Sequence, residues 1–130
     1  MSKKIMIADD NPVVHDLVSA QMAVLGHEVA GVETNGKNVL ATYRRLNPDL
    51  LILDISFEDT DGLTVLRQLR AAYPEAKVLV LSANDQKETR SIVTKLKAAF
   101  LAKPFAVADI QAAVAKIFAQ SSSNSAGAFK

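Results

Sequence analysis

The chain of 130 residues contains no cysteine and only two histidines, His15 and His27. Without cysteine it can form no disulfide, no thiolate nucleophile and no thiolate metal site. Neither histidine follows a predicted strand, so both are interpreted as ordinary helix or loop residues, and zinc is not expected. The sequence also has no Gly-rich P-loop for a nucleotide, and nothing in it indicates a Ser-His-Asp triad.

Long apolar runs and an excess of charge of one sign are also missing. Lys and Arg total 15 and Asp and Glu total 14, which gives a net charge of +1. This balance gives no electrostatic reason to expect nucleic acid, a membrane surface or a polyanion as partner. No apolar stretch approaches the roughly 20 residues of a membrane span, and the first apolar run is too short for a signal peptide. A cytoplasmic location is therefore the default expectation.

What the sequence does contain is an alternation of short apolar runs and amphipathic segments, repeated five times. Three of the runs (IMIA, LLIL and VLVL) are continuously apolar, as is typical of strands buried on both faces. The alternation predicts βαβ units with a parallel sheet, and so an α/β protein built as a three-layer (βα)5 sandwich. The predicted strands are Ile5–Ala8, Val29–Val32, Leu50–Leu53, Val78–Leu81 and Phe100–Ala102.

Local signals predict where helices begin and where regular structure ends. Asn11 is expected to cap the first helix, with Pro12 at its first position. Asp85 and Glu88 resemble a capping box at the start of the fourth helix. Residues 120–130 are small and polar, which predicts a flexible tail or the stub of a linker.

Polar side chains follow four of the five predicted strands. In an open parallel sheet, ligands bind beyond the carboxyl ends of the strands, so these side chains are expected to converge at one edge. Each alone has an ordinary interpretation as a cap, a solvated loop residue or a surface charge, and their convergence is what indicates a site. The residues are Asp9 and Asp10 after the first strand, Asp54 after the third, Ser82 after the fourth and Lys103 after the fifth.

This set of residues favours phosphoryl chemistry beside a hard cation. Three clustered carboxylates repel one another, which favours protonation of one of them unless a cation is present. Their oxygen atoms suit Mg²⁺, which often binds through one or two carboxylates and phosphate oxygens. A carboxylate beside Mg²⁺ can attack phosphorus and form an acyl phosphate. The metal, Lys103 and the Ser82 hydroxyl would then share the charge on the phosphoryl oxygens.

Five dispersed motifs make the chain similar to the receiver domain of two-component response regulators. They are IMIADDNPVV at the start, LLILDI, the DGL of residues 61–63, VLVLSA, and FLAKPF near the end. The resemblance implies a flavodoxin-like receiver domain over residues 1–119, with strand order 2-1-3-4-5. It also implies that the chain is not an enzyme acting on an external substrate, and that it promotes only its own phosphorylation and dephosphorylation.

The resemblance also implies a role for each residue of the site. Asp54 would be the phosphoacceptor. Asp9 and Asp10 would hold Mg²⁺ directly or through water, together with Asp54 and the backbone carbonyl of Ser56. Lys103 would bridge to the carboxylate or the phosphoryl group.

A conformational switch is implied as well. Ser82 would turn toward the phosphoryl oxygen, which would let the aromatic ring of Phe100 move inward. The Lys103–Pro104 peptide is expected to be cis, against a general frequency of about 5–6% for X–Pro bonds. The surface that changes would comprise the fourth helix, the fifth strand and the fifth helix. Candidates for its partner-facing side are Arg90, Val93, Lys97, Phe100 and Ala102.

Two segments depart from the family pattern. The loop after Asp54 commonly reads Met-Pro in the family, whereas this chain has Phe57 and Glu58. Glu58, Asp59 and Asp61 make this loop acidic, and we interpret the acids as solvated; the alternative is that they tune metal affinity or partner choice. Ala98 and Ala99 replace the glycines that usually precede the aromatic, which leaves the geometry of that turn open.

The expected partners are a histidine kinase or phosphotransfer protein as donor and an unidentified downstream protein, with no nucleic acid or membrane bound by this domain. A monomer or a phosphorylation-dependent dimer is expected. Three alternatives stay open: the N-terminal receiver of a longer DNA-binding transcriptional regulator, a non-phosphorylated pseudo-receiver, and a flavin-binding electron carrier. The last would need a hydroxyl- and Gly-rich phosphate loop where the chain has Asp-Asp-Asn-Pro.

Overall fold

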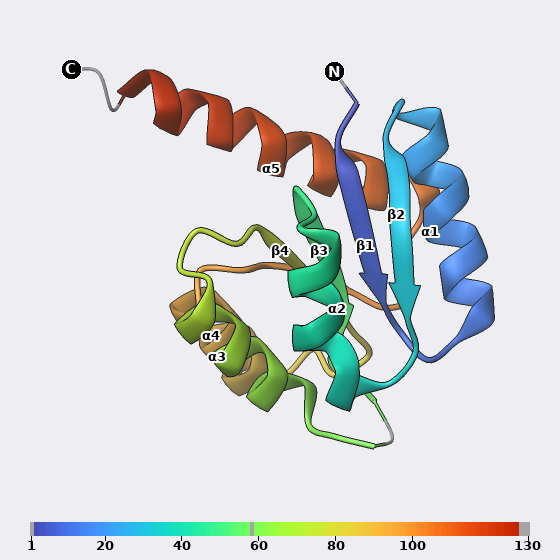
Figure 1. Ribbon diagram of the computed structural model, residues 1–130, viewed down its shortest axis with the longest axis vertical. Helices are drawn as coiled ribbons and strands as arrows, with labels where there is room; N and C mark the ends of the chain where they lie inside the picture. The colour runs from blue at the N-terminus through green and yellow to red at the C-terminus, as the bar shows by residue number, and fades with distance from the viewer. Residues whose placement is uncertain (1, 58, 128–130) are drawn as a thin grey trace.

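Strands and helices alternate along the computed structural model, which describes residues 2–57 and 59–127, without the side chains of residues 121–127. Within this part of the chain, five strands alternate with five α-helices and one short 3-10 helix, η1 (Figure 1). The strands are β1 (Lys4–Ala8), β2 (Glu28–Glu33), β3 (Leu50–Asp54), β4 (Val78–Ser82) and β5 (Ala99–Ala102). The helices are α1 (Pro12–Val24), η1 (Gly36–Asn38), α2 (Val39–Leu46), α3 (Gly62–Ala72), α4 (Lys87–Lys95) and α5 (Val107–Gly127). All five predicted strands are present, each longer by one or two residues than predicted.

The strands form one parallel sheet in the order β2-β1-β3-β4-β5, which confirms the predicted strand order. Ala8 pairs with Leu53, Asp54 with Leu81, and Ser82 with Ala102. The carboxyl ends of β1, β3, β4 and β5 therefore meet at one edge of the sheet. The residues predicted to form the site lie at that edge, either at the last position of a strand or directly after it.

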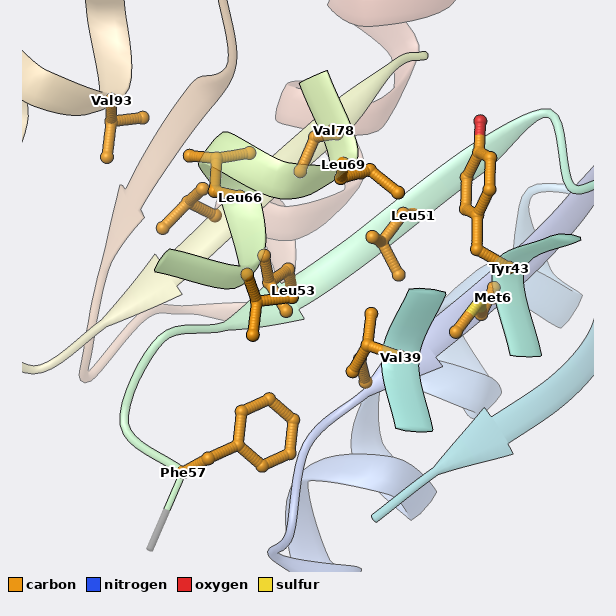
Figure 2. Packing of buried hydrophobic residues seen from close by; sticks show 13 residues of the cluster. Met6, Val39, Tyr43, Leu51, Leu53, Phe57, Leu66, Leu69, Val78 and Val93 are labelled. Carbon is orange, nitrogen blue, oxygen red and sulfur yellow. The ribbon is translucent and has the colours of Figure 1, made fainter. Parts of the chain in front are cut away.

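Two apolar clusters hold helices on the two faces of the sheet. One joins strand residues such as Met6, Leu51 and Leu53 to the helices α2, α3 and α4 (Figure 2). The other joins Ile7 and Ile52 to α1 and α5. Alternate residues of β1, β3 and β4 enter opposite clusters, which is why these strands read as continuous apolar runs.

The predicted cap of the first helix is confirmed and that of the fourth is wrong. The Asn11 side chain accepts a hydrogen bond from the Val13 amide at 2.9 Å, and α1 begins at Pro12. Helix α4 instead begins at Lys87, and its N-cap residue makes no side-chain capping bond. The carboxylate of Asp85 is engaged by the Arg90 side chain, which competes with the backbone amides for it.

Helix α5 continues to Gly127, whereas regular structure was predicted to end near residue 120. Ser, Asn and Ala are middling to good helix formers, and no proline interrupts them, so a helix already nucleated upstream can extend through them. In Figure 1 this helix runs past the sheet. The division of the chain at residue 119 stays a prediction, and residues 128–130 lie outside the described part. No helix that the structure describes combines the length and apolarity of a membrane span.

The turn between α4 and β5 is closed by a residue in the left-handed region. Lys97 has a φ of 58°. Its amide donates to Thr94 at 2.9 Å, and the Ala98 amide donates to Val93 at 3.1 Å, so the last carbonyls of α4 are paired. Lysine thus takes the conformation that glycine usually supplies at a helix end, which answers the question raised by Ala98 and Ala99.

Replacing Lys97 with glycine is expected to stabilise the fold by roughly 0.5 kcal/mol, because a left-handed conformation costs about 1–2 kcal/mol for a residue with a Cβ and glycine recovers part of this. Chemical denaturation followed by circular dichroism measures the effect. Asn47→Gly is the matched control. Asn47 has a φ of 47°, and because asparagine tolerates this region, glycine is expected to gain less stability there than at Lys97. A Lys97→Gly variant less stable than the natural chain would contradict the account of this turn.

Candidate functional site

Three carboxylates from two neighbouring strands meet at the carboxyl edge of the sheet. Asp9 and Asp10 follow β1, and Asp54 is the last residue of β3. One oxygen of each lies within 4.8 Å of the others. Asp9 is 1% exposed and Asp54 is 4% exposed, whereas Asp10 is open to solvent. The structure thus brings together the acidic residues predicted from the sequence.

Lys103 places one positive charge against this cluster. Its Nζ donates to Asp54 Oδ2 at 2.8 Å and lies 3.5 Å from Asp9 Oδ2. Burial alone would lower the pKa of Lys103, but the hydrogen bond to Asp54 and the charges of both carboxylates raise it above its usual value. The ammonium is therefore protonated at neutral pH and is held at the carboxylates.

The pKa of Asp9 is raised above its usual value. Burial is the main cause and the negative charge of Asp54 adds to it, while the hydrogen bond from the Asn11 amide and the charge of Lys103 act in the opposite direction. Independently of this shift, the cluster of three carboxylates faces the ammonium of Lys103, so the site carries excess negative charge when all three are ionised. This is the electrostatic condition in which a divalent cation is attracted.

The two oxygens of Asp54 have different partners. Oδ1 accepts a hydrogen bond from the Ser56 amide at 2.9 Å, whereas Oδ2 faces Lys103. The first contact fixes the carboxylate against the loop that follows β3, and the second aims its other oxygen toward β5. The carboxylate is thus held in one orientation by groups of its own chain.

His15 also contacts the site, and the sequence analysis did not single it out for this. Its Nε2 donates to the backbone carbonyl of Asp9. One helical turn separates His15 from the Asn11 cap of α1, so the ring can reach back over the strand end. That spacing from Asn11 was the only sequence signal for the contact.

Ser82 and the cis peptide lie at the same edge. Ser82 is fully buried, and its hydroxyl oxygen accepts from the Asn84 amide at 2.9 Å. The Lys103 amide donates to the Ser82 carbonyl at 2.8 Å, which ties the end of β5 to the end of β4. The Lys103–Pro104 peptide is cis, as predicted.

Phe100 lies on β5 and is half-buried against α4. The guanidinium of Arg90 lies 4.5 Å from the centroid of its ring, a cation–π contact. Val93 on the same helix is fully buried in the core (Figure 2), so its suggested place on a partner-facing surface is wrong. Its position on α4 directs its side chain toward the sheet. The prediction had placed it by its location on the fourth helix alone, without regard to which side of the helix it occupies.

Asp59 and Asp61, two acids of the loop after Asp54, are exposed to solvent, as predicted, and both also accept backbone hydrogen bonds. Asp59 accepts hydrogen bonds from the amides of Gly36 and Lys37, at 3.0 and 3.1 Å. Asp61 is the N-cap of α3 and accepts from the Leu63 amide at 3.0 Å. Glu58 lies outside the described residues. The partners of Asp59 are far away in sequence, so only the folded chain reveals them.

The donor set fits a hard divalent cation. It consists of carboxylate oxygens close enough to share one ion, and the sequence contains no cysteine thiolate. A cavity of about 390 Å³ elsewhere in the molecule has no part in this. Its lining comes from the segments before β3 and β4, including Tyr43 and Tyr73, and so lies at the opposite edge of the sheet.

Comparison with known proteins gives one family. Residues 5–115 match the model of the response regulator receiver domain. The chain is 29% identical over 120 residues to the chemotaxis protein CheY of Thermotoga maritima, with 90% of this chain and 98% of CheY covered. It is 32% identical over 109 residues to the probable transcriptional regulatory protein TcrX of Mycobacterium tuberculosis. That match covers 82% of this chain but only 45% of TcrX.

Solved structures share the fold. A chain from the crystal structure of the CheX-CheY-BeF3-Mg+2 complex of Borrelia burgdorferi superposes with a TM-score of 0.84. The two are 22% identical, and 88% of each chain is covered. The receiver domain of the Francisella response regulator 1452 superposes with a TM-score of 0.81 at 24% identity, covering 92% of this chain and 98% of that one. At these identities the likeness establishes the flavodoxin-like receiver fold.

Proposed function

Since the chain belongs to the response regulator receiver domain family of two-component signalling, we propose that Asp54 accepts a phosphoryl group and that its phosphorylation state controls binding of a partner. The observation that supports this most directly is the environment of the Asp54 carboxylate. It is 4% exposed, its Oδ1 is fixed by the Ser56 amide, and its Oδ2 faces the Lys103 ammonium beside Asp9. A structural ion pair would need Lys103 and one carboxylate, and would not explain three carboxylates at one point.

In the proposed reaction, a carboxylate oxygen of Asp54 attacks the phosphorus of a phosphohistidine on a kinase or phosphotransfer protein. The new O–P bond forms as the P–N bond breaks, and the electron pair of that bond stays on the imidazole nitrogen. The Ser56 amide keeps the carboxylate oriented during the attack. The Lys103 ammonium, already 2.8 Å from Oδ2, then faces the transferred phosphoryl oxygens.

Asp9, Asp10, Asp54 and the backbone carbonyl of Ser56 would hold Mg²⁺. When bound, the ion would neutralise charge on the attacking carboxylate and the phosphoryl oxygens. The 4.8 Å spacing of the carboxylate oxygens of Asp9, Asp10 and Asp54 supports this assignment.

The phosphoryl group adds about −1.5 to −2 charges, and it acts by favouring one of two existing conformations. In this switch the Ser82 side chain turns toward that group and gives up the hydrogen bond that it accepts from the Asn84 amide. This frees the loop before α4, and Phe100 can follow inward from its place beside Arg90. The proposed partner surface therefore comprises α4, β5 and α5, with Arg90, Lys97, Phe100 and Ala102 as candidate contacts. The partner could be a separate downstream protein. It could also be a DNA-binding domain in a longer chain, an alternative that is kept because the match covers only 45% of TcrX.

The proposal is tested by intact-mass spectrometry after incubation with acetyl phosphate, with Mg²⁺ or with EDTA. One phosphoryl adduct is expected on the natural chain in Mg²⁺, and none is expected with EDTA or in an Asp54→Asn variant. Asp16→Asn, which changes an exposed aspartate of α1 in the same way, is the matched control and is expected to gain the adduct.

A folded chain that gains no adduct and does not bind beryllofluoride in a direct titration would contradict the proposal and favour the pseudo-receiver. An adduct retained in Asp54→Asn would place the acceptor elsewhere.

A further inference from the structure

The loop that carries Ser56 is fastened to a different part of the molecule by Asp59. The two carboxylate oxygens of Asp59 accept from the successive amides of Gly36 and Lys37, at 3.0 and 3.1 Å. These amides open η1, and Asn35, the residue in its N-cap position, makes no side-chain capping bond. Asp59 therefore caps this turn from 23 residues away. The Lys37 amide bond and the Gly36 bond hold the pKa of Asp59 below its usual value.

The contact is close as well as polar. Gly36 is buried, and a Cβ there would lie 2.1 Å from Thr60 Cγ2 and 3.1 Å from Phe57 Cγ. Side chains of the loop after β3 thus rest directly on Gly36, and a larger residue there would require Thr60 to shift. Phe57 is 8% exposed and packs in the core beside Val39, so it anchors the same loop from below (Figure 2).

The far end of the loop is fixed too. Asp61 caps α3, and a Cβ on Gly62 would lie 2.2 Å from the Cα of Ile55. The two ends of the loop therefore touch. Ser56, which is exposed, lies between Ile55 and Phe57, and its amide donates to Asp54. Both neighbours of Ser56 are therefore held in place, Ile55 by its contact with Gly62 and Phe57 by the core.

The β2–α2 turn that receives Asp59 is itself connected to the carboxylate cluster through Asp9. Glu33 accepts from the amides of Thr34 and Asn35, at 3.1 and 3.0 Å, and from the Thr42 hydroxyl at 2.5 Å. The carbonyl of Glu33 accepts from the Asp9 amide at 3.0 Å. The Asp9 side and the Ser56 side of the site are thus connected through the turn that Asp59 caps.

We propose that Asp59 is a positioning residue for the metal: by capping Gly36 and Lys37 it holds the Ser56 carbonyl in the direction that selects Mg²⁺. The inference rests on the proposed function. Mg²⁺ requires nearly ideal octahedral geometry, whereas Ca²⁺ accepts flexible and variable geometry. Loosening the loop therefore costs Mg²⁺ binding more than Ca²⁺ binding. Simple loss of a nearby negative charge weakens both ions alike.

The test compares the affinities for Mg²⁺ and for Ca²⁺, measured separately by NMR titration of ¹³C,¹⁵N-labelled protein, with the Ser56 carbonyl shift as one reporter. Asp59→Asn is expected to weaken Mg²⁺ about tenfold and Ca²⁺ by less than about threefold. Gly36→Ala keeps every charge and displaces the loop, so it is expected to lower the Mg²⁺ to Ca²⁺ affinity ratio in the same direction. Glu75→Gln, an exposed acid at the opposite edge of the sheet, is the matched control and is expected to leave both affinities unchanged.

Unchanged Mg²⁺ affinity in Asp59→Asn overturns the inference, and so do equal losses for the two ions. Circular dichroism checks that the variants fold; if Gly36→Ala does not, the affinity ratio in Asp59→Asn decides alone. A natural chain that binds no Mg²⁺, or binds it equally well as Asp54→Asn, overturns the proposed metal site and the inference with it. Mg²⁺ binding that needs Asp54 but ignores Asp59 overturns the inference only.

Discussion

Replacing Lys103 with methionine is expected to slow phosphoryl acceptance by about 100- to 1,000-fold and to tighten Mg²⁺ binding roughly tenfold. The two effects have opposite signs because Lys103 plays two parts. Its Nζ lies 2.8 Å from Asp54 Oδ2, where it can stabilise the transferred phosphoryl group. In the absence of that group, it competes with a metal ion for the same carboxylates. Methionine keeps most of the packing of the side chain and removes the charge together with the hydrogen bond to Asp54.

The rate is measured from the time course of the intact-mass adduct with acetyl phosphate at saturating Mg²⁺, and the affinity from an NMR titration. Saturating Mg²⁺ matters, because it separates the loss in rate from any change in metal occupancy. Lys95→Met on the exposed side of α4 is the control and is expected to change neither quantity. A fast-phosphorylated Lys103→Met variant would mean that Lys103 only balances charge. A variant with weaker Mg²⁺ binding would mean that the ammonium organises the carboxylates instead of competing for them.

The sequence predicted the sheet and the acidic site because both follow from short-range patterns. The runs IMIA, LLIL and VLVL are buried on both faces, and such runs are typical of the central strands of a covered sheet. Once the strands are parallel, the residue that ends each of them is brought to the common edge by topology alone. Asp9 and Asp54 could therefore be placed together without knowing any contact between them.

Contacts between loops could not be predicted in this way. The bond from Asp59 to the Gly36 amide spans 23 residues and depends on how two turns pack together. The same holds for Lys97, whose left-handed conformation is imposed by the closing of α4 onto β5. Asp85 shows the opposite failure, because a local pattern predicted a cap that does not form. Its carboxylate binds the side chain of Arg90, five residues later, and not the backbone amides of α4. In each case the deciding partner is a backbone amide or a long side chain, and neither leaves a pattern in the sequence.

Arg70 is a further residue of this kind, and Arg70→Ala is expected to destabilise the fold by about 3 kcal/mol. Its guanidinium joins the end of α3 to the end of α4, two helix ends whose carbonyls favour a cation. Nε donates to the Leu96 carbonyl at 2.8 Å. The other nitrogens donate to the carbonyls of Tyr73, Pro74, Ala76 and Lys97, at 3.3, 2.9, 2.8 and 3.2 Å. Removing the side chain leaves these five carbonyls, of which those of Leu96, Tyr73 and Ala76 are in part-buried contacts, without their donor.

Because the planar guanidinium of Arg70 donates to carbonyls at both helix ends, Arg70→Lys separates the effect of this geometry on stability from that of the charge. A lysine ammonium keeps the charge but cannot reach both turns at once, so this variant is expected to lose about 2 kcal/mol. Arg67→Ala, an exposed arginine on the same helix, is expected to change stability by less than about 0.5 kcal/mol. Urea unfolding followed by circular dichroism gives all three values. If Arg70→Lys had the same free energy of unfolding as the natural chain, the positive charge at the helix ends would account for the stabilisation. If Arg70→Ala had it, water would replace the guanidinium at no cost, and α4 would not depend on its link to α3.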